Sequence, residues 1–97
     1  MKSYKLKDAG KDPFRVDALA KWMGFGAVDD SGREMKVRVE DSALERLDPS
    51  SRGADHTHVL VAHRDKIFKI AAEKYELGYI ESDDIISVTE ADVAQLG

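Results

Sequence analysis

The residues of this chain with the clearest capacity for chemistry are His63, Arg64 and Lys74, which lie in the stretch from His58 to Gly78. A guanidinium can grip a carboxylate or a phosphate through two parallel hydrogen bonds, and an ammonium supplies a point charge. An imidazole can add a hydrogen bond or a proton. We therefore predict His63, Arg64 and Lys74 as a candidate interaction or anion-binding site.

The element that must position these three side chains is predicted as one amphipathic helix of about five turns over 58–78, which Gly78 would end as a left-handed C-cap. Its apolar half is assigned by helical spacing to Val59, Leu60, Ile67, Phe68, Ile70, Ala71, Tyr75 and Leu77. The three basic residues fall within or beside this half, where an unpaired charge would be costly to bury. Each must therefore reach water, pair with a carboxylate or face an opening. Ion pairs that fix the helix to a sheet are the alternative to a binding site.

Little in the sequence supports catalysis or metal binding. The letters HRD at 63–65 begin the catalytic loop of protein kinases, but Ile70 stands where that loop has its magnesium-binding Asn, and there is no Gly-rich loop. The chain has three histidines, His56, His58 and His63. Their separations of two, five and seven residues do not match helical metal-ligand pairs. The chain also has no cysteine. We predict no catalytic residue, no metal and no cofactor.

Length and composition predict a single domain over 1–97. An apolar fraction of 42% with 35% charged residues is typical of a globular protein. No apolar run approaches the roughly 20 residues that span a bilayer, and no signal peptide is recognised, so we expect a cytoplasmic protein without membrane contact. A protein partner is compatible with these features, and the oligomeric state stays open between monomer and homodimer.

The net charge of −4 is unevenly distributed, with +3 over residues 1–28 and −7 over 29–97. The acidic remainder would repel phosphate backbones, which makes nucleic acid an unlikely partner. Nucleic-acid binding through a basic N-terminal arm is the alternative function. The basic residues of this arm are Lys2, Lys5, Lys7, Lys11, Arg15 and Lys21. Residues 1–13, which include Gly10 and Pro13, are predicted as a possible mobile lead-in.

A β-hairpin is predicted next. Residues 16–25 fit either a helix or a strand, but the turn residues at 29–32 favour a strand for their second half. After this turn, Met35, Val37 and Val39 alternate with charged residues, as in an antiparallel strand with one buried face.

Further elements follow the hairpin. Ser42 and Glu45 have the spacing of a capping box that opens a short helix ending near Asp48. Residues 86–88 form a short predicted strand, and Thr89 with Asp92 repeats the capping spacing before a last short helix.

The stretch from Glu34 to Val93 resembles a family of small bacterial proteins of unknown function. The resemblance lies in the order of its parts: the strand MKVRVE, a short helix, the pattern R-x-x-I-x-x-x-A-x-x-K from Arg64 to Lys74, and a short strand ending in VT. It implies an α+β domain in which a small antiparallel sheet is formed by the N-terminal hairpin and a C-terminal strand. A short and a long helix would cover one face of that sheet. The resemblance supplies no activity.

These observations favour a small non-catalytic binding or regulatory module. The alternative is a nucleic-acid-associated factor that uses the basic arm. A third possibility is an enzyme in which Arg64 holds an acidic substrate.

Overall fold

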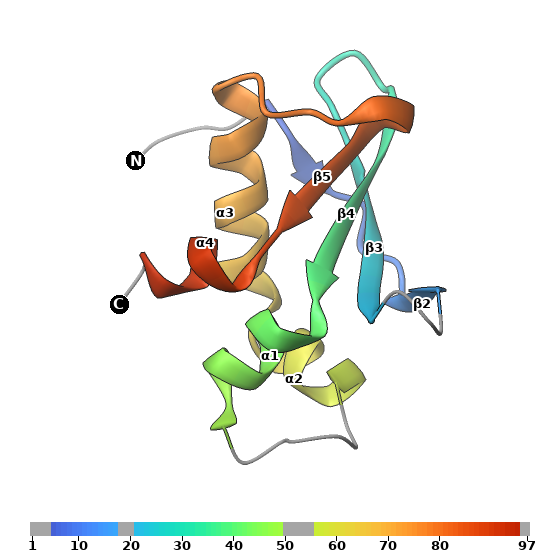
Figure 1. The fold of residues 1–97 in the computed structure, drawn as a ribbon. Helices are drawn as coiled ribbons and strands as arrows, with labels where there is room; N and C mark the ends of the chain where they lie inside the picture. The colour runs from blue at the N-terminus through green and yellow to red at the C-terminus, as the bar shows by residue number, and fades with distance from the viewer. Residues whose placement is uncertain (1–4, 18–20, 50–55, 96–97) are drawn as a thin grey trace.

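The computed structural model describes residues 5–17, 21–49 and 56–95. Figure 1 shows an α+β fold in which the helices lie to one side of a twisted sheet. The strands are β1 (Lys7–Asp8), β2 (Phe14–Asp17), β3 (Trp22–Val28), β4 (Glu34–Glu40) and β5 (Ile85–Val88). The helices are α1 (Asp41–Leu47), α2 (His56–Ala62), α3 (Arg64–Glu76), the 3₁₀ turn η2 (Ser82–Asp84) and α4 (Glu90–Ala94).

The hairpin predicted from the sequence is present as β3 and β4, which pair antiparallel along their whole length. Both β1 and β2 pair antiparallel with the other side of β3, one near its end and one near its start. They therefore act as a single interrupted edge strand. The sheet order is β1 (with β2)–β3–β4–β5. The segment 16–25, which fitted either helix or strand, supplies strand residues up to Asp17 and again from Trp22.

The α+β class is confirmed, but the prediction of a wholly antiparallel sheet is wrong at β5, which runs parallel to β4. The chain passes through α1, α2 and α3 between these two strands. A long crossover of this kind delivers a parallel neighbour, whereas a tight hairpin cannot. The sheet is therefore mixed.

The predicted single helix over 58–78 is wrong: it is two helices that meet at His63. The backbone of His63 has φ −113° and ψ 17°, outside the helical range. Helix α2 packs against α1 and β3, whereas α3 packs against β5 and β4. The break allows α2 and α3 to pack against different elements, although the spacing of apolar residues in the sequence continues across it.

The buried apolar side chains form one cluster between the helices and the sheet. Alternate strand residues contribute to it, among them the predicted Met35, Val37 and Val39. Leu6 also belongs to the core with 1% exposure, and Lys7 and Asp8 pair with β3. This part of the predicted lead-in is therefore a packed edge of the sheet, while residues 1–4 lie outside the described residues.

The predicted helix ends are mostly confirmed. Gly78 has φ 84° after α3, and the N–H groups of Gly78 and Tyr79 donate to the carbonyls of Tyr75 and Lys74, which is the Schellman arrangement. Thr89 and Asp92 form the predicted capping box of α4. The capping box at Ser42 and Glu45 is wrong. Helix α1 begins at Asp41, with Glu40 as its N-cap and no cap hydrogen bond from the side chain of Glu40.

Candidate functional site

Arg64 lies at the first residue of α3 and holds the edge strand β1. Its Nε donates to Oδ2 of Asp8 and its Nη2 to Oδ1, both at 2.7 Å. The guanidinium also lies over the ring of Phe25, with 4.6 Å to the ring centroid. Only 18% of the Arg64 side chain is exposed. Its hydrogen-bonding fork is already occupied by a carboxylate of the same chain.

The electrostatics of Asp8 reflect this pairing. Partial burial raises the pKa of Asp8, but the hydrogen bonds from Arg64 and from the N–H of Gly10, together with the Arg64 charge, outweigh it. The pKa of the Asp8 carboxyl therefore lies below its ordinary value. The charged pair is the stable form at neutral pH.

Lys74 lies in the last turn of α3 and joins the helix to β5 and α4. Its Nζ donates to the backbone carbonyl of Ser87 at 2.6 Å and to Oδ2 of Asp92 at 2.8 Å. Partial burial raises the pKa of the Asp92 carboxyl. The hydrogen bonds from Lys74 and Thr89, together with the Lys74 charge, outweigh this effect, so the pKa of Asp92 lies below its ordinary value. Ser87 is on the outermost strand β5, so Lys74 ties the end of α3 to this edge of the sheet.

His63 is near Arg64 only because the two residues are consecutive in the chain. Its backbone forms the break between α2 and α3. Its backbone N–H donates to Val59, and its carbonyl accepts from Ile67. Its side chain is half-buried. Arg64 and Lys74 lie at opposite ends of α3, so the three predicted residues do not form one cluster.

A groove with exposed apolar side chains lies beside Lys74, and the sequence analysis did not predict it. It consists of two adjoining hollows of about 360 and 270 Å³ that share Lys74 and Tyr79. We call it the α3–β5 groove; its lining residues are Ile70, Glu73, Lys74, Leu77, Gly78, Tyr79, Ile80, Glu81, Ser87, Asp92 and Gln95. Leu77, Tyr79 and Ile80 are 71%, 62% and 41% exposed. Leu77 was expected on the buried half of the helix and instead lies in the open.

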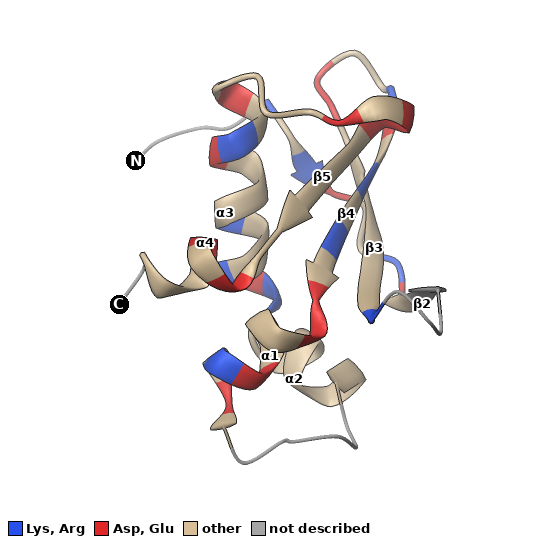
Figure 2. Ribbon diagram, viewed as in Figure 1, with Lys and Arg blue, Asp and Glu red and all other residues tan. Residues whose placement is uncertain are grey.

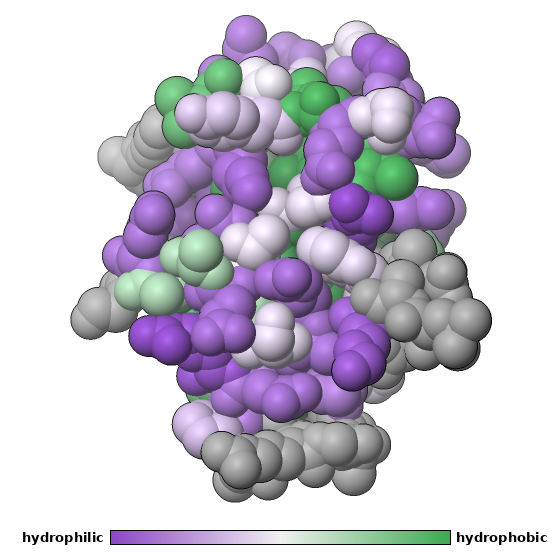
Figure 3. All heavy atoms as spheres, in the orientation of Figure 1, coloured by the Kyte–Doolittle hydropathy of each residue, from purple (hydrophilic) through white to green (hydrophobic). Residues whose placement is uncertain are grey.

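The surface view agrees with these exposures. Figure 3 shows green, hydrophobic atoms gathered at the top of the molecule, where α3 ends and the chain turns toward β5. Leu77, Tyr79 and Ile80 are thus exposed within a short stretch of the chain.

A polar network closes one wall of the groove. The hydroxyl of Ser87 donates to Glu81 and accepts from Nε of Arg38 at 2.6 Å. Nη2 of Arg38 also donates to Glu81, at 3.0 Å. Arg38 in turn lies over the ring of Trp22, 4.4 Å from its centroid. The polar groups here satisfy one another, and the network fixes the position of Glu81.

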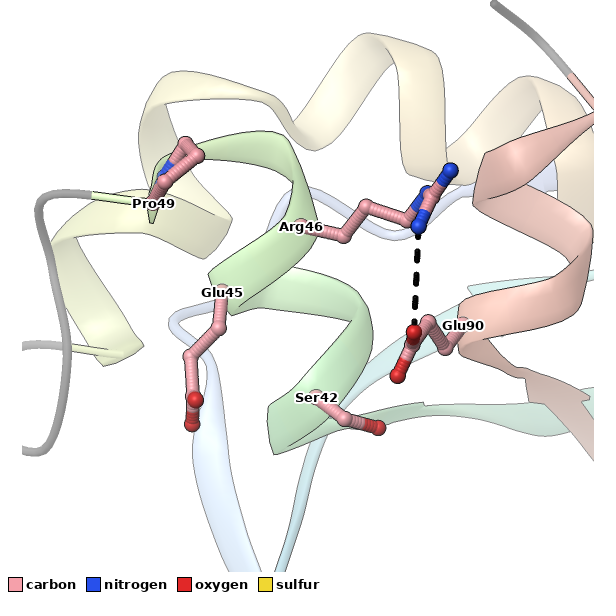
Figure 4. Close-up of a pocket in the computed structure, with 5 residues that line it drawn as sticks. All are labelled: Ser42, Glu45, Arg46, Pro49 and Glu90. Carbon is pink, nitrogen blue, oxygen red and sulfur yellow. Dashed lines mark ion pairs between the residues drawn. The ribbon is translucent and has the colours of Figure 1, made fainter.

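A larger hollow of about 650 Å³ lies between α1 and the start of α4. Figure 4 shows that Arg46 points toward Glu90, with which it forms an ion pair at 3.8 Å, while Glu45 points away from this pair. Glu45 lies 3.1 Å from Nε2 of His56. The side chains of this hollow do not converge on a common point, so we do not assign a site there.

The other sequence predictions can be placed on the fold. Within the described ranges, no three or more potential ligand side chains gather as a metal site would require. Of the basic arm, Lys5, Lys7, Lys11 and Lys21 are exposed, whereas Lys2 and the side chain of Arg15 lie outside what is described. None of the described helices has the length and apolar character needed to cross a membrane.

The fold and the groove define a small α+β domain with exposed apolar side chains at the end of α3. No family model matches the chain, and no curated protein matches it. The fold is similar to the crystal structure of a protein of unknown function from the DUF1488 family of Shewanella loihica PV-4. The TM-score is 0.70 over 91% of this chain and 96% of that chain, at 15% sequence identity. At this identity the likeness shows the shared fold. The neighbour is a bacterial protein of unknown function, in agreement with the resemblance drawn from the sequence.

Proposed function

We propose that the protein is a small non-catalytic binding module that docks a partner protein in the α3–β5 groove. The observation that carries this proposal is the exposure of Leu77, Tyr79 and Ile80 beside two adjoining hollows. Burying this surface against a partner would gain hydrophobic free energy, at about 25 cal/mol per Å² of apolar area.

The rigidity of the groove supports a docking role. The Schellman turn at Gly78 fixes the path of the chain between Leu77 and Tyr79. Lys74 ties the floor of the groove to β5 and α4, and Glu81 is held by Arg38 and Ser87. A surface that is already ordered loses less conformational entropy when it binds.

Charge around the groove indicates the kind of partner. Its lining contains three acidic residues, Glu73, Glu81 and Asp92, and one basic residue, Lys74, which pairs with Asp92, while Glu81 pairs with Arg38 of β4. Figure 2 shows acidic segments at the end of α3, at η2 and on α4. A partner segment that combines apolar and basic residues would complement this surface, and its association would be weakened by salt.

Site-specific crosslinking tests the docking role. A photoreactive phenylalanine derivative replaces Tyr79 in the groove and, as the matched control, Val61, which is 55% exposed on α2. We expect position 79 to crosslink a defined protein in cells of the native host, and position 61 to leave that protein unmodified. Adding Leu77→Lys to the Tyr79 probe is expected to abolish the crosslink, because a charge would replace the apolar contact. Equal crosslinking at both positions would contradict the proposal.

A further inference from the structure

A separate hollow lies on the other face of the sheet, beside Gly26. It has a volume of about 430 Å³ and lies between the hairpin and the segment that joins β1 to β2. Its lining includes Ala9, Lys11, Asp12, Phe14, Gly26 and Glu34. Sites for small ligands have volumes of roughly 300–1,000 Å³. We call this feature the Gly26 hollow.

The interrupted edge strand creates the Gly26 hollow. β1 ends at Asp8 and β2 begins at Phe14. Between them Gly10 adopts φ 74°, and Pro13 cannot donate a ladder hydrogen bond. The N–H of Ala9 still donates to the carbonyl of Gly26 at 3.2 Å, so the chain leaves the sheet after Ala9 and returns at Phe14, and Gly26 lies in the floor of the hollow beside this gap.

Gly26 itself has no structural explanation in the fold. It has no positive φ, and a Cβ added there would meet only the methyl of Ala9, at an ordinary contact distance of 3.7 Å. Glycine inside a strand weakens the strand relative to other residues. Its effect here is to keep the floor of the hollow flat and open, as at sites where a ligand approaches backbone closely.

The surroundings of the floor indicate the shape and polarity of a ligand. Phe14 is 41% exposed and forms an aromatic wall, and the ammonium of Lys36 lies 5.7 Å from its ring centroid. The rim offers one further lysine, Lys11, and two carboxylates, Asp12 and Glu34. With Lys36 these formal charges cancel, so no net charge favours an ion of either sign.

We propose that the Gly26 hollow binds a planar, uncharged heteroaromatic ring. The flat floor and the Phe14 wall suit a ring that stacks, because offset and edge-to-face aromatic contacts are favourable. The lysines donate hydrogen bonds and the carboxylates accept them, so a ring with both donors and acceptors at its edge matches the rim. This site is independent of the α3–β5 groove.

Four small probes test the proposal by backbone amide NMR. Nicotinamide is planar and neutral, cyclohexanecarboxamide is neutral but not planar, and benzoate and benzylamine are planar ions. We expect saturable shifts centred on Gly26 and Phe14 with nicotinamide, and at least tenfold weaker binding of the other three. Comparable binding of cyclohexanecarboxamide or of either ion would overturn the proposed ligand class.

Two variants place the binding in the hollow. The Cβ of Gly26→Val meets only the Ala9 methyl at an ordinary contact distance, and its two further methyl groups occupy the floor, so we expect a folded protein, checked by its melting transition, with at least tenfold weaker nicotinamide binding. Ala62→Val adds a similar side chain on an exposed helix face and should leave binding unchanged. Phe14→Leu removes the aromatic wall and should also weaken binding at least tenfold. Unchanged nicotinamide binding in Phe14→Leu, or no saturation in the wild type, would overturn the proposal.

Discussion

The two ends of helix α3 contain basic residues that looked alike in the sequence but have different surroundings in the structure. At its start, Arg64 donates hydrogen bonds to Asp8 and lies over the ring of Phe25. At its end, Lys74 is also paired, with Asp92, but it lies in the floor of a groove whose apolar side chains are exposed. The start of α3 therefore packs against the core, whereas its end lies beside exposed apolar side chains.

This difference shows why a cation on an apolar helix face is weak evidence for a site by itself. Both cations fasten α3 to neighbouring elements. The end at which we propose that a partner binds is distinguished by Leu77, Tyr79 and Ile80, which are exposed. The contrast makes four predictions about stability, described from the largest effect to the smallest.

The largest loss is expected for Arg64→Met. It removes two charge-assisted hydrogen bonds and leaves the partly buried Asp8 carboxylate without its cation. We expect the free energy of unfolding to fall by about 2–3 kcal/mol. Urea denaturation measures this loss. The exposed Lys66→Met serves as the control on the same helix, and an equal, small change in both variants would show that the Arg64 pair contributes nothing.

A smaller loss is expected for Lys74→Met. Its long apolar stem is retained by methionine, but the bonds to the Ser87 carbonyl and to Asp92 are lost. We expect about 1–2 kcal/mol of destabilisation in the same urea experiment. A loss greater than that of Arg64→Met would remove the contrast between the two ends of the helix.

Acid should weaken the wild type through Asp8 and Asp92. Both have a lowered pKa in the folded state, so their stabilising contribution is complete above the unfolded Asp pKa of about 3.9. It is lost as the pH falls through the folded values. We expect urea midpoints to decrease below about pH 4, and less steeply in Arg64→Met. Parallel curves for the two proteins would contradict the role of the Arg64 pair in this loss.

The smallest effect on stability is expected for Leu77→Lys. The side chain is 71% exposed and lies outside the core cluster. We expect the free energy of unfolding to change by no more than about 0.5 kcal/mol. Thermal unfolding measured by circular dichroism checks this, with Ile67→Ala in the buried part of α3 as the destabilised comparison. A loss similar to that of Ile67→Ala would mean that Leu77 belongs to the core.

The sequence predicted the features that depend on local pattern. The alternation at Met35, Val37 and Val39 identified a buried strand face, and Gly78 and Thr89 marked helix ends correctly. These features rest on strand geometry and on hydrogen bonds between near neighbours, which residue types reveal directly.

Features that depend on distant parts of the chain could not be predicted in this way. A four-residue strand has no sign of its direction, so the parallel pairing of β5 was missed. The break at His63 follows from the different elements beneath α2 and α3. Asp8 is 56 residues from Arg64, and nothing local connects them. The groove arises because no described element covers Leu77, whose spacing alone indicated burial.

The most direct test of the difference between the two ends uses the partner captured at position 79. Its affinity for the purified protein is measured by isothermal titration calorimetry with Leu77→Lys and Arg64→Met, at a temperature where both variants are folded. We predict at least tenfold weaker binding for Leu77→Lys and unchanged binding for Arg64→Met. Unchanged binding by Leu77→Lys, a loss confined to Arg64→Met, or no protein captured at position 79 would contradict the account.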